Sequence, residues 1–353
     1  MKKQDYKVIG VMSGTSLDGI DLVCVRFTSG TRWKFFIEAA ETVVYTAAWK
    51  EVLGRLHEET PDRVQEVNNR YTELLGNVLK EFIFKHHLEG IDAICSHGHT
   101  VFHQPEKGIT FQLGNQKKLA ERVGHTVVCD FRTQDVALGG QGAPLVPVGD
   151  QLLFGNYDAC LNLGGFANAS LKKEGVLVAF DLCAVNTVLN FLAQKKGLEY
   201  DFGGALAKKG RQIDILFEAL ESLDFYAQTS PKSLGIEWVY TTLFPLLKKY
   251  DSHPVEDLLY TYSHHIGKQI GQCFDSGQQV LASGGGVKNE FLMDQIQKNT
   301  SARIVVPDSE TIDFKEALIF GLLGVLRLRG ENNCLASVTG APRDHSSGII
   351  FQP

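Results

Sequence analysis

Three short glycine-rich segments contain the residue types that a phosphate-binding site needs. They span residues 13–19, 163–167 and 283–286, and each follows an apolar run that predicts a strand. Glycine lets backbone N–H groups point into one concavity, where they can bind an anion. One such segment is as easily a tight turn, but three of them in both halves of the chain fit a nucleotide held between two domains. We therefore expect phosphate contacts from the first segment and from Gly164, Gly165, Gly284, Gly285 and Gly286.

The first glycine segment also carries hydroxyl and carboxyl side chains. Thr15 and Ser16 add hydroxyl donors, and Asp18 lies at the tip. Asp18 is placed to hold Mg²⁺ through water, because magnesium keeps several waters and takes one or two carboxylates. The alternative is a turn-forming aspartate bonded to its own backbone. Asp21 lies in the next predicted strand, where an unpaired carboxylate would be costly, so we expect a polar role for it.

A histidine-rich segment follows a predicted strand near residue 95. Residues 96–105 contain His97, His99 and His103, three of the eleven histidines. Their spacing resembles that of metal ligands, which makes a metallohydrolase with bound zinc one hypothesis. No acidic residue lies between His99 and His103, however, and no other histidine or cysteine cluster completes a site. We favour polar residues that line a substrate cleft, with a structural role as the alternative for His103.

Two charged residues follow buried strands, which is where ligand groups usually lie in α/β sheets. Arg132 can clamp a carboxylate or phosphate through two hydrogen bonds. The alternative for Arg132 is a surface ion pair with Asp135, which would contribute little energy. Asp181 ends another apolar run and is a candidate general base, or else the N-cap of the helix that follows.

The elements that must position these residues alternate between strands and helices, which predicts an α/β fold. In the first half, apolar runs on both sides of residues 13–19 predict a hairpin. Apolar residues at helical spacing predict an amphipathic helix at 61–87. Further strands are expected at 34–45, 93–95, 110–113 and 126–129, with a helix at 116–123. A sharp rise in glycine content near residues 138–144 marks the predicted boundary, which gives domains 1–137 and 138–353.

The second half opens in the same way as the first, with strands on both sides of a glycine turn. The expected strands are 159–163, 167–171, 176–180, 279–282 and 302–306. The expected helices are 185–195, 210–220, 239–250, 255–274, a helix from 288 onward, and 315–328. We therefore predict duplicated domains that face a cleft, with the last ~15 residues packed back on the first domain.

Composition limits the class of protein. A chain of 353 residues exceeds what one core usually supports, and 44% hydrophobic with 22% charged residues is typical of a globular protein. The net charge of −6 and the lack of a basic tract argue against nucleic-acid or membrane partners. No membrane helix or signal peptide is predicted, and seven widely spaced cysteines fit free thiols in a reducing cytoplasm. A homodimer is the commonest assembly for such a chain.

Seven blocks of sequence, in order along most of the chain, resemble the signature blocks of the anhydro-N-acetylmuramic acid kinase family. The first and the fifth are the most specific. The blocks are residues 13–21 (SGTSLDGID), 96–98 (SHG), 112–115 (QLGN), 130–132 (DFR), 139–147 (GGQGAPLVP), 162–168 (NLGGFAN) and 283–289 (SGGGVKN).

This resemblance implies a fold, a reaction and cofactors. The fold is that of the sugar kinase, actin and heat-shock ATPase superfamily, with two ribonuclease-H-like domains around a nucleotide cleft. The implied reaction uses ATP, Mg²⁺ and water. It converts the amino sugar 1,6-anhydro-N-acetylmuramic acid to N-acetylmuramic acid 6-phosphate, a phosphotransfer to an alcohol group that belongs to peptidoglycan recycling.

The resemblance also implies roles for individual residues. Asp181 matches the aspartate that activates water for attack at the anomeric carbon, and Arg132 matches the arginine that contacts the sugar. His99, Thr100 and Asn186 fall in or beside the blocks expected to bind the sugar. The phosphate and metal contacts are implied for Gly14, Thr15, Ser16, Leu17, Asp18, Gly19, Ile20 and Asp21.

The chain departs from the family pattern at two places. From the catalytic aspartate the family usually reads DTGPGN, whereas residues 181–186 read DLCAVN; the family also often has Gln at the position of His99. These changes leave two further hypotheses besides the anhydro-sugar kinase. One is a kinase of the same fold that acts on another amino sugar. The other is a catalytically inactive nucleotide-binding sensor of cell-wall fragments.

Overall fold

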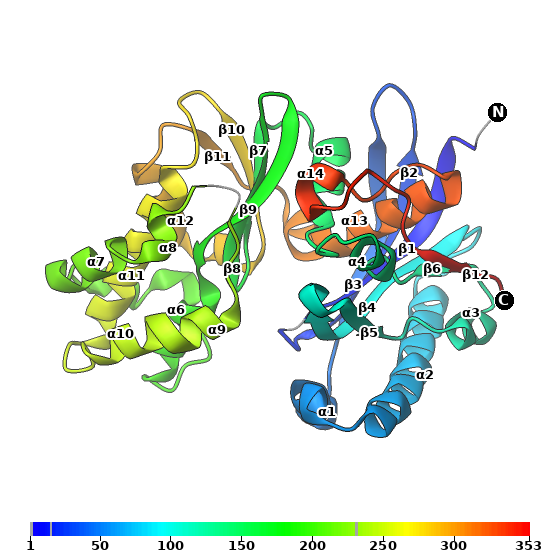
Figure 1. The fold of residues 1–353 in the computed structure, drawn as a ribbon, viewed down its shortest axis with the longest axis horizontal. Coiled ribbons are helices and arrows are strands. Elements are labelled where there is room, and N and C mark those ends of the chain that lie inside the picture. Colours follow the sequence, from blue (N-terminus) through cyan, green and yellow to red (C-terminus); the bar gives the residue numbers. More distant parts are fainter. Residues whose placement is uncertain (1–2, 15, 230–231) are drawn as a thin grey trace. The chain divides into compact units, whose positions relative to one another are not determined.

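The computed structural model describes residues 3–14, 16–229 and 232–353, which divide into two units (Figure 1). Unit 1 comprises Met1–Leu153 and Phe314–Pro353, and unit 2 comprises Phe154–Asp313. The boundary expected between residues 137 and 138 therefore falls inside unit 1. The glycine-rich loop after it is bonded to unit 1, because the Gly142 N–H donates to Asp135 and the Gln141 N–H donates to the carbonyl of Thr339.

Unit 1 is built on a seven-stranded sheet in the order β12-β6-β4-β1-β2-β3, with β5 paired to β4. The first three strands form an antiparallel meander, and β4 and β6 run parallel to β1. The strands are β1 Asp5–Ser13, β2 Gly19–Thr28, β3 Lys34–Val44, β4 Ala93–Gln104, β5 Ile109–Leu113, β6 Val127–Cys129 and β12 Ile349–Phe351.

Alternating side chains of these strands face two different helical layers. Ile9 and Val11 of β1 belong to a buried cluster with the apolar stripe of α2 (Pro61–Lys85) and with α3 (Lys117–Val123). On the opposite face, Gly10 lies under α13 (Ser309–Arg329), where an added Cβ would be 2.0 Å from the carbonyl oxygen of Ala317. The missing side chain is what lets this helix approach the sheet so closely.

The other helices of unit 1 are short and connect these layers. They are α1 Ala47–Arg55, η1 Leu56–Glu58, η2 Pro105–Lys107, α4 Thr133–Ala137, α5 Val146–Leu153 and α14 Ala336–Thr339.

Unit 2 repeats the topology of unit 1 with five strands, in the order β11-β10-β7-β8-β9. Its first three strands are again antiparallel, and β10 and β11 again run parallel to the first. The strands are β7 Ala159–Leu163, β8 Phe166–Lys173, β9 Val176–Ala184, β10 Gln279–Ser283 and β11 Arg303–Val305.

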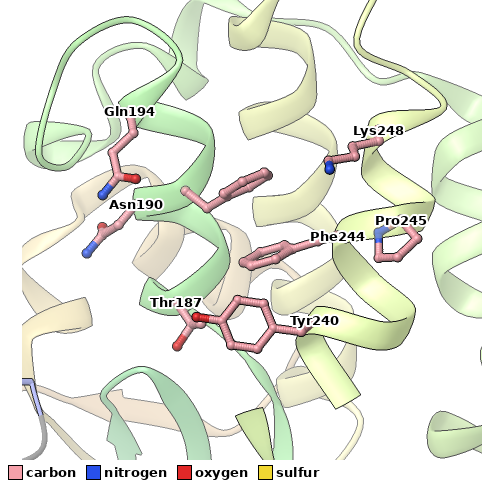
Figure 2. Close-up of a pocket in the computed structure, with 8 residues that line it drawn as sticks. Thr187, Asn190, Gln194, Tyr240, Phe244, Pro245 and Lys248 are labelled. Atoms are coloured by element: carbon pink, nitrogen blue, oxygen red, sulfur yellow. The ribbon is translucent and has the colours of Figure 1, made fainter. Parts of the chain in front are cut away.

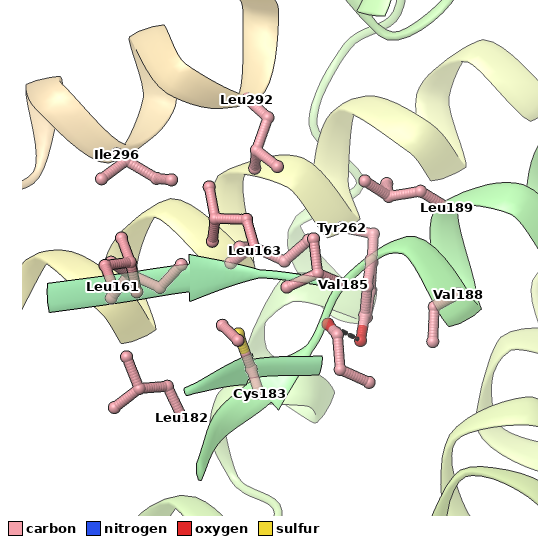
Figure 3. Close-up of a cluster of buried hydrophobic side chains, with 14 of the residues drawn as sticks. Leu161, Leu163, Leu182, Cys183, Val185, Val188, Leu189, Tyr262, Leu292 and Ile296 are labelled. Carbon is pink, nitrogen blue, oxygen red and sulfur yellow. Dashed lines mark hydrogen bonds between the residues drawn. The ribbon is translucent and has the colours of Figure 1, made fainter. Parts of the chain in front are cut away.

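The core of unit 2 lies between its sheet and the helices that follow the strands in sequence. Leu161 and Leu163 of β7 pack with residues of α6 (Asn186–Gln194), α11 (Val255–Gly271) and α12 (Glu290–Lys298), as Figure 3 shows. Tyr262 of α11 is fully buried, and its hydroxyl donates to the carbonyl of Ala184 at 2.9 Å. That bond satisfies a polar group that would be costly to bury alone.

The remaining helices of unit 2 complete its helical layer. They are η3 Phe202–Gly204, η4 Ala207–Lys209, α7 Asp214–Glu221, α8 Asp224–Ala227, α9 Ile236–Trp238, the π-helix η5 Val239–Leu243, α10 Phe244–Lys248 and η6 Gly285–Lys288. None of the helices seen in residues 3–14, 16–229 and 232–353 is both long and apolar enough to cross a bilayer.

The repeated strand order confirms the predicted α/β class with two ribonuclease-H-like domains. Several elements nevertheless differ from the sequence-based expectation. Strand β4 was expected to end at residue 95 but continues to Gln104, because its polar second half pairs with β5. Strand β9 was expected to end at residue 180 but continues to Ala184, and β12 was not expected.

Candidate active site

The first glycine turn begins at Ser13, which belongs to a buried network of hydroxyl groups. The Ser13 hydroxyl lies 2.6 Å from the Tyr45 hydroxyl and 3.2 Å from Nδ1 of His99, and Tyr45 in turn lies 2.8 Å from the Tyr71 hydroxyl. Strands β1 and β4 pair in parallel with Ser13 opposite His99. The structure therefore brings the predicted sugar residue His99 to the start of the predicted phosphate turn.

The turn is tight at two of its residues, Leu17 and Gly19. Leu17 has a left-handed φ of 61°, and its N–H donates to the carbonyl of Gly14 at 3.4 Å. Gly19 lies where a Cβ would be 2.5 Å from the carbonyl oxygen of Val43, so only glycine fits this close approach. Among the other predicted contacts, Thr15 lies outside the described residues. Ser16 and Asp18 are exposed, and Ile20 is buried at the start of β2.

Asp21 has the polar role that was expected for it. It is half-buried in β2, and Oδ1 accepts a hydrogen bond of 2.6 Å from the Thr42 hydroxyl. Asp18, by contrast, is exposed, so it is the carboxylate of this turn that water and a cation can reach.

His97 and Arg132 form the second polar group at this end of the unit 1 sheet. Nδ1 of His97 is 2.8 Å from the carbonyl of Gly98, and Nε2 of His97 accepts a 2.8 Å bond from Nε of Arg132. This pattern requires the neutral imidazole, with its proton on Nδ1. Burial, with the positive charge of Arg132 second, holds the pKa of His97 well below its usual value. His97 is therefore a fixed acceptor that orients the guanidinium.

Arg132 has a second anchor in the glycine-rich loop. Its Nη1 donates to the carbonyl of Gly142 at 2.5 Å. Burial lowers the pKa of Arg132 to about 10, while the negative charges of Glu316 and Asp135 act to raise it. The guanidinium thus stays charged at neutral pH, and two of its nitrogens are held by the protein. The alternative of a surface ion pair between Arg132 and Asp135 is wrong, because Asp135 is fully buried and its oxygens have other partners.

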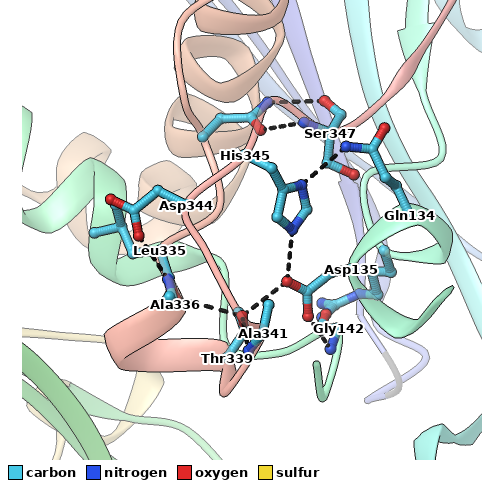
Figure 4. A network of polar contacts seen from close by, with 12 residues as sticks. Gln134, Asp135, Gly142, Leu335, Ala336, Thr339, Ala341, Asp344, His345 and Ser347 are labelled. Carbon is cyan, nitrogen blue, oxygen red and sulfur yellow. Dashed lines mark hydrogen bonds and ion pairs between the residues drawn. The ribbon is translucent and has the colours of Figure 1, made fainter. Parts of the chain in front are cut away.

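Asp135 is the centre of a buried network that connects the loop to the C-terminal segment (Figure 4). Oδ2 accepts from the Gly142 N–H at 2.7 Å, and Oδ1 accepts from the Thr339 hydroxyl at 2.7 Å and from Nε2 of His345 at 2.8 Å. Gln134 completes the network through Nδ1 of His345 at 3.0 Å. Asp135 therefore holds the same loop residue whose carbonyl holds Arg132.

The three histidines of the zinc hypothesis do not converge in the structure. Nδ1 of His97 and Nδ1 of His99 are used as described above, and Nδ1 of His103 is 3.1 Å from the Thr110 hydroxyl on β5. In the part of the chain that the structure describes, the one group with metal-ligand proximity is Asp135, Cys334 and His345. Both oxygens of Asp135 are already satisfied by donors, so hydrogen bonding explains that group.

The second and third glycine turns pack against each other in unit 2. Gly284 has a left-handed φ of 85°, and a Cβ there would be 2.6 Å from Oδ1 of Asn162. A Cβ at Gly286 would be 2.7 Å from the Cβ of Leu163. At Gly285 the nearest atom to an added Cβ would be Nδ2 of Asn186, at 4.0 Å. The two turns therefore pack tightly against each other at Gly284 and Gly286, while Gly285 has room for an added Cβ.

Asp181 lies on the same sheet, in a row of polar residues. Asn162 of β7 is opposite Asn168 of β8, and Asn168 is opposite Asp181 of β9. Opposed residues on antiparallel strands share a face, so the three side chains lie on one face of the sheet. The register shifts between Ala167 and Asn168, and β-bulges of this kind redirect side chains beside active sites.

The carboxyl group of Asp181 is held by a segment that the sequence did not indicate. Oδ2 accepts from the Leu234 N–H at 2.8 Å and from the Ser233 hydroxyl at 3.1 Å. Burial raises the pKa of Asp181, and these two hydrogen bonds oppose that shift. The N-cap alternative is wrong, since Asp181 lies within β9 and the residue that precedes α6 as its cap is Val185.

Asn186 begins α6 beside the second glycine turn. Its Nδ2 donates to the carbonyl of Leu163 at 3.4 Å, and the Thr187 hydroxyl donates to the carbonyl of Gly165 at 3.0 Å. From Thr187 a cavity of about 510 Å³ extends along α6, with the stacked rings of Phe191 and Phe244 on its wall (Figure 2). Thr100, the other predicted sugar contact, is half-buried in β4 next to His99.

The residues that depart from the family pattern are buried. Leu182, Cys183, Ala184 and Val185 all belong to the hydrophobic core of unit 2. His99 is also buried, and burial lowers its pKa to about 4. The altered motif therefore changes core packing next to Asp181, while the carboxyl group itself faces the polar row.

Sequence reasoning missed the supporting roles of three residues. Tyr45, Asp135 and Ser233 each bond to a predicted residue or to its loop. Ser233 lies 52 residues from Asp181 in sequence, and its neighbours form no recognisable motif. Asp135 was considered only as a surface partner of Arg132, although the loop that it holds lies in the block at residues 139–147.

Comparison with known proteins identifies the family. The family model described as anhydro-N-acetylmuramic acid kinase matches residues 6–353. The anhydro-N-acetylmuramic acid kinase of Aliivibrio fischeri is 33% identical over 98% of this chain and 99% of its own length, and that of Methylorubrum extorquens is 31% identical over 98% and 99%. Among solved structures, component A of (R)-2-hydroxyglutaryl-CoA dehydratase from Acidaminococcus fermentans covers 90% of this chain and 96% of its own, at 12% identity and a TM-score of 0.46. With its family match over almost the whole chain and full-length relatives above 30% identity, this chain belongs to the anhydro-N-acetylmuramic acid kinase family.

Proposed function

We propose that this protein is an ATP-dependent kinase that opens 1,6-anhydro-N-acetylmuramic acid with water and phosphorylates it to N-acetylmuramic acid 6-phosphate. Family membership supports this activity. The observation that carries it is the placement of the predicted residues within each unit. In unit 1, Arg132 and His99 lie at the sheet edge that bears Ser13 and the first glycine turn. In unit 2, Asp181 lies on the sheet that bears the other two turns.

The glycine turns fit the phosphates of ATP. Within the described segments, the N–H groups of Gly165 and Gly285 donate to no backbone carbonyl of another element, so a ligand can accept from them. Asp18 is the exposed carboxylate suited to hold Mg²⁺ through water. ATP supplies the γ-phosphoryl group when bound, and Mg²⁺ offsets the charge that develops on it.

Asp181 is the general base of the proposed reaction. Its carboxylate takes a proton from water while the water oxygen bonds to the anomeric carbon and the bond from that carbon to O6 breaks. The electron pair of the broken bond stays on O6, which then takes the γ-phosphoryl group. The raised pKa of Asp181 favours this role, because a base works best when its pKa approaches the working pH.

Arg132 and its neighbours orient the sugar in this proposal. Since Nε and Nη1 of Arg132 are held by His97 and Gly142, the guanidinium has a fixed plane toward its ligand. His99, Thr100 and Asn186 are the further sugar contacts that we propose. A guanidinium with fixed geometry suits an oxygen-rich ligand, because it offers several donors in one plane.

The test is a coupled assay that follows ADP with the purified protein, ATP, Mg²⁺ and 1,6-anhydro-N-acetylmuramic acid. We expect sugar-dependent ADP release and a product heavier than the substrate by one water and one phosphoryl group. A panel of open-ring amino sugars serves as the comparison. Phosphorylation of open-ring sugars alone would mean a kinase for another amino sugar, and nucleotide binding without sugar-dependent ADP release would mean a sensor.

A further inference from the structure

The segment that follows α8 (Asp224–Ala227) contacts Asp181 through three consecutive residues. The Lys232 carbonyl accepts from the Asp181 N–H at 2.9 Å. The Ser233 hydroxyl and the Leu234 N–H both donate to Oδ2 of Asp181, at 3.1 Å and 2.8 Å. Backbone and side chain of Asp181 are thus tied to the same short segment.

The two oxygens of the Asp181 carboxylate therefore have different surroundings. Oδ2 accepts both of the hydrogen bonds that the structure shows for this group. Within residues 3–14, 16–229 and 232–353, no protein group donates to Oδ1. A carboxylate oxygen can accept more than one hydrogen bond, so Oδ1 keeps its lone pairs available for water or substrate.

The contacting segment is itself anchored to the body of unit 2. Nζ of Lys232 donates to the carbonyl of Phe225 at 3.1 Å and lies over the Phe225 and Tyr226 rings, at 4.3 Å and 5.7 Å from their centroids. The side chain of Leu234 is buried. Ser233 lies between these two anchors, so its hydroxyl has a fixed place from which to donate.

We propose that Ser233 is a positioning residue for the proposed base, and that with the Leu234 N–H it holds Oδ2 of Asp181 so that Oδ1 is the atom that accepts the proton of water. This inference rests on the proposed function. In the step, Oδ1 gains the proton, the water oxygen bonds to the anomeric carbon, and O6 leaves with its electron pair. Oδ2 stays bonded to its two donors throughout.

The charges around Asp181 make Ser233 the group to test. Lys232 directs its ammonium group toward the rings of α8, and the Cys183 thiol, two residues along β9, has its pKa raised strongly by burial. The causes that act on the pKa of Asp181 are burial, the Leu234 N–H and the Ser233 hydroxyl. Of the two donors, the serine hydroxyl can be removed by a side-chain change that leaves the backbone unaltered.

The experiment compares Ser233→Ala with Ser233→Thr, which keeps the hydroxyl, and with the matched control Ser222→Ala. Ser222 is exposed in the same unit, and its hydroxyl donates to the Ala219 carbonyl of its own helix. We expect Ser233→Ala to lower kcat roughly 10-fold, the effect of losing one hydrogen bond to a charged group, with little change in KM for ATP. Because the lost donor stabilised the ionised carboxylate, the acidic limb of kcat against pH moves to higher pH. Ser233→Thr and Ser222→Ala keep the wild-type profile.

A second measurement separates this inference from the proposed function. Carbon-13 NMR of aspartate-labelled protein, assigned with Asp181→Asn, reports the titration of the Asp181 carboxyl whether or not the enzyme turns over. A higher titration midpoint in Ser233→Ala supports the positioning role, whether or not the enzyme releases ADP in response to sugar. A lack of sugar-dependent ADP release would overturn only the kinase proposal. An unchanged midpoint, or a wild-type pH profile in active Ser233→Ala, overturns the role of Ser233.

Discussion

The two units have sheets of the same strand order but hold their key polar groups in different ways. In unit 1, Arg132 is fixed by His97 and by the Gly142 carbonyl, and behind that loop Asp135 is fully buried and bonded to the C-terminal segment. In unit 2, Asp181 is half-buried and is held by a short segment whose Ser233 is exposed.

The two networks differ in whether they mainly affect folding stability or the reaction rate. A buried carboxylate with three donors contributes to folding, because removing it leaves several buried polar groups without partners. A hydrogen bond from an exposed hydroxyl contributes little to folding but can still fix the geometry of a reacting group. We therefore expect changes in the unit 1 network to lower stability first, and changes around Asp181 to lower the rate first.

The largest effect should come from Asp181→Asn. The variant should lose roughly 10²–10⁴-fold in kcat, the usual contribution of a general base, with nucleotide affinity unchanged. Its melting temperature should not fall, since burial disfavours the ionised carboxylate and the Asn oxygen can still accept from the Leu234 N–H. Steady-state kinetics, nucleotide titration and thermal unfolding measure these three quantities. Wild-type turnover in Asp181→Asn would remove the base from the mechanism.

Asp135→Ala tests the other side of the comparison. Loss of this buried carboxylate leaves the Gly142 N–H, the Thr339 hydroxyl and Nε2 of His345 without their acceptor, so we expect a loss of about 3–5 kcal/mol in the free energy of unfolding. Urea unfolding measures it. Asp251→Ala, which removes an exposed partner of Lys195, is the control and should change little. Equal stability of the two variants would contradict the proposed division between the units.

Arg132→Lys tests whether the fixed guanidinium of unit 1 acts on the sugar. Lysine cannot donate to Nε2 of His97 and to the Gly142 carbonyl while presenting a planar cation, so kcat/KM for the sugar should fall roughly 10- to 100-fold. The KM for ATP should stay near that of the wild type. If both substrates are affected equally, Arg132 does not act on the sugar alone.

The last prediction concerns a difference in pH dependence between the units, which is small over any one pH unit. His99 has a folded pKa of about 4, below the 6.5 of an unperturbed histidine, so between these values the unfolded chain binds a proton that the folded protein excludes. Its contribution to stability is present above about pH 6.5 and is lost as the pH falls toward 4, at up to about 1.4 kcal/mol for each pH unit. Asp181 acts in the opposite direction, because its raised pKa means that ionisation costs stability as the pH rises.

His99→Gln should therefore weaken the loss of stability on acidification, as measured by urea unfolding at several pH values. His57→Gln replaces an exposed histidine of η1 and controls for the loss of any imidazole. A slope in His99→Gln as steep as in the wild type would mean that His99 is not the group that titrates.

Much of the fold was predictable from local pattern. The amphipathic stripe of α2 and the glycine turn between β7 and β8 lie where apolar spacing and turn residues placed them. Strand β4 was predicted too short, because its second half is polar and is a strand only by pairing with β5. Strand β12 comes from the far end of the chain, and nothing in its short sequence indicates its pairing with β6.

The sequence by itself determined the α/β class, the family and the residues whose side chains could take part in binding or catalysis. It could do so because periodicity, glycine turns and motif blocks are local properties. Only the tertiary structure decided which groups support them. Ser233 reaches Asp181, and His345 reaches Asp135, across long stretches of chain. Such partners are chosen by strand register and loop packing, and these depend on contacts that no local window of sequence contains.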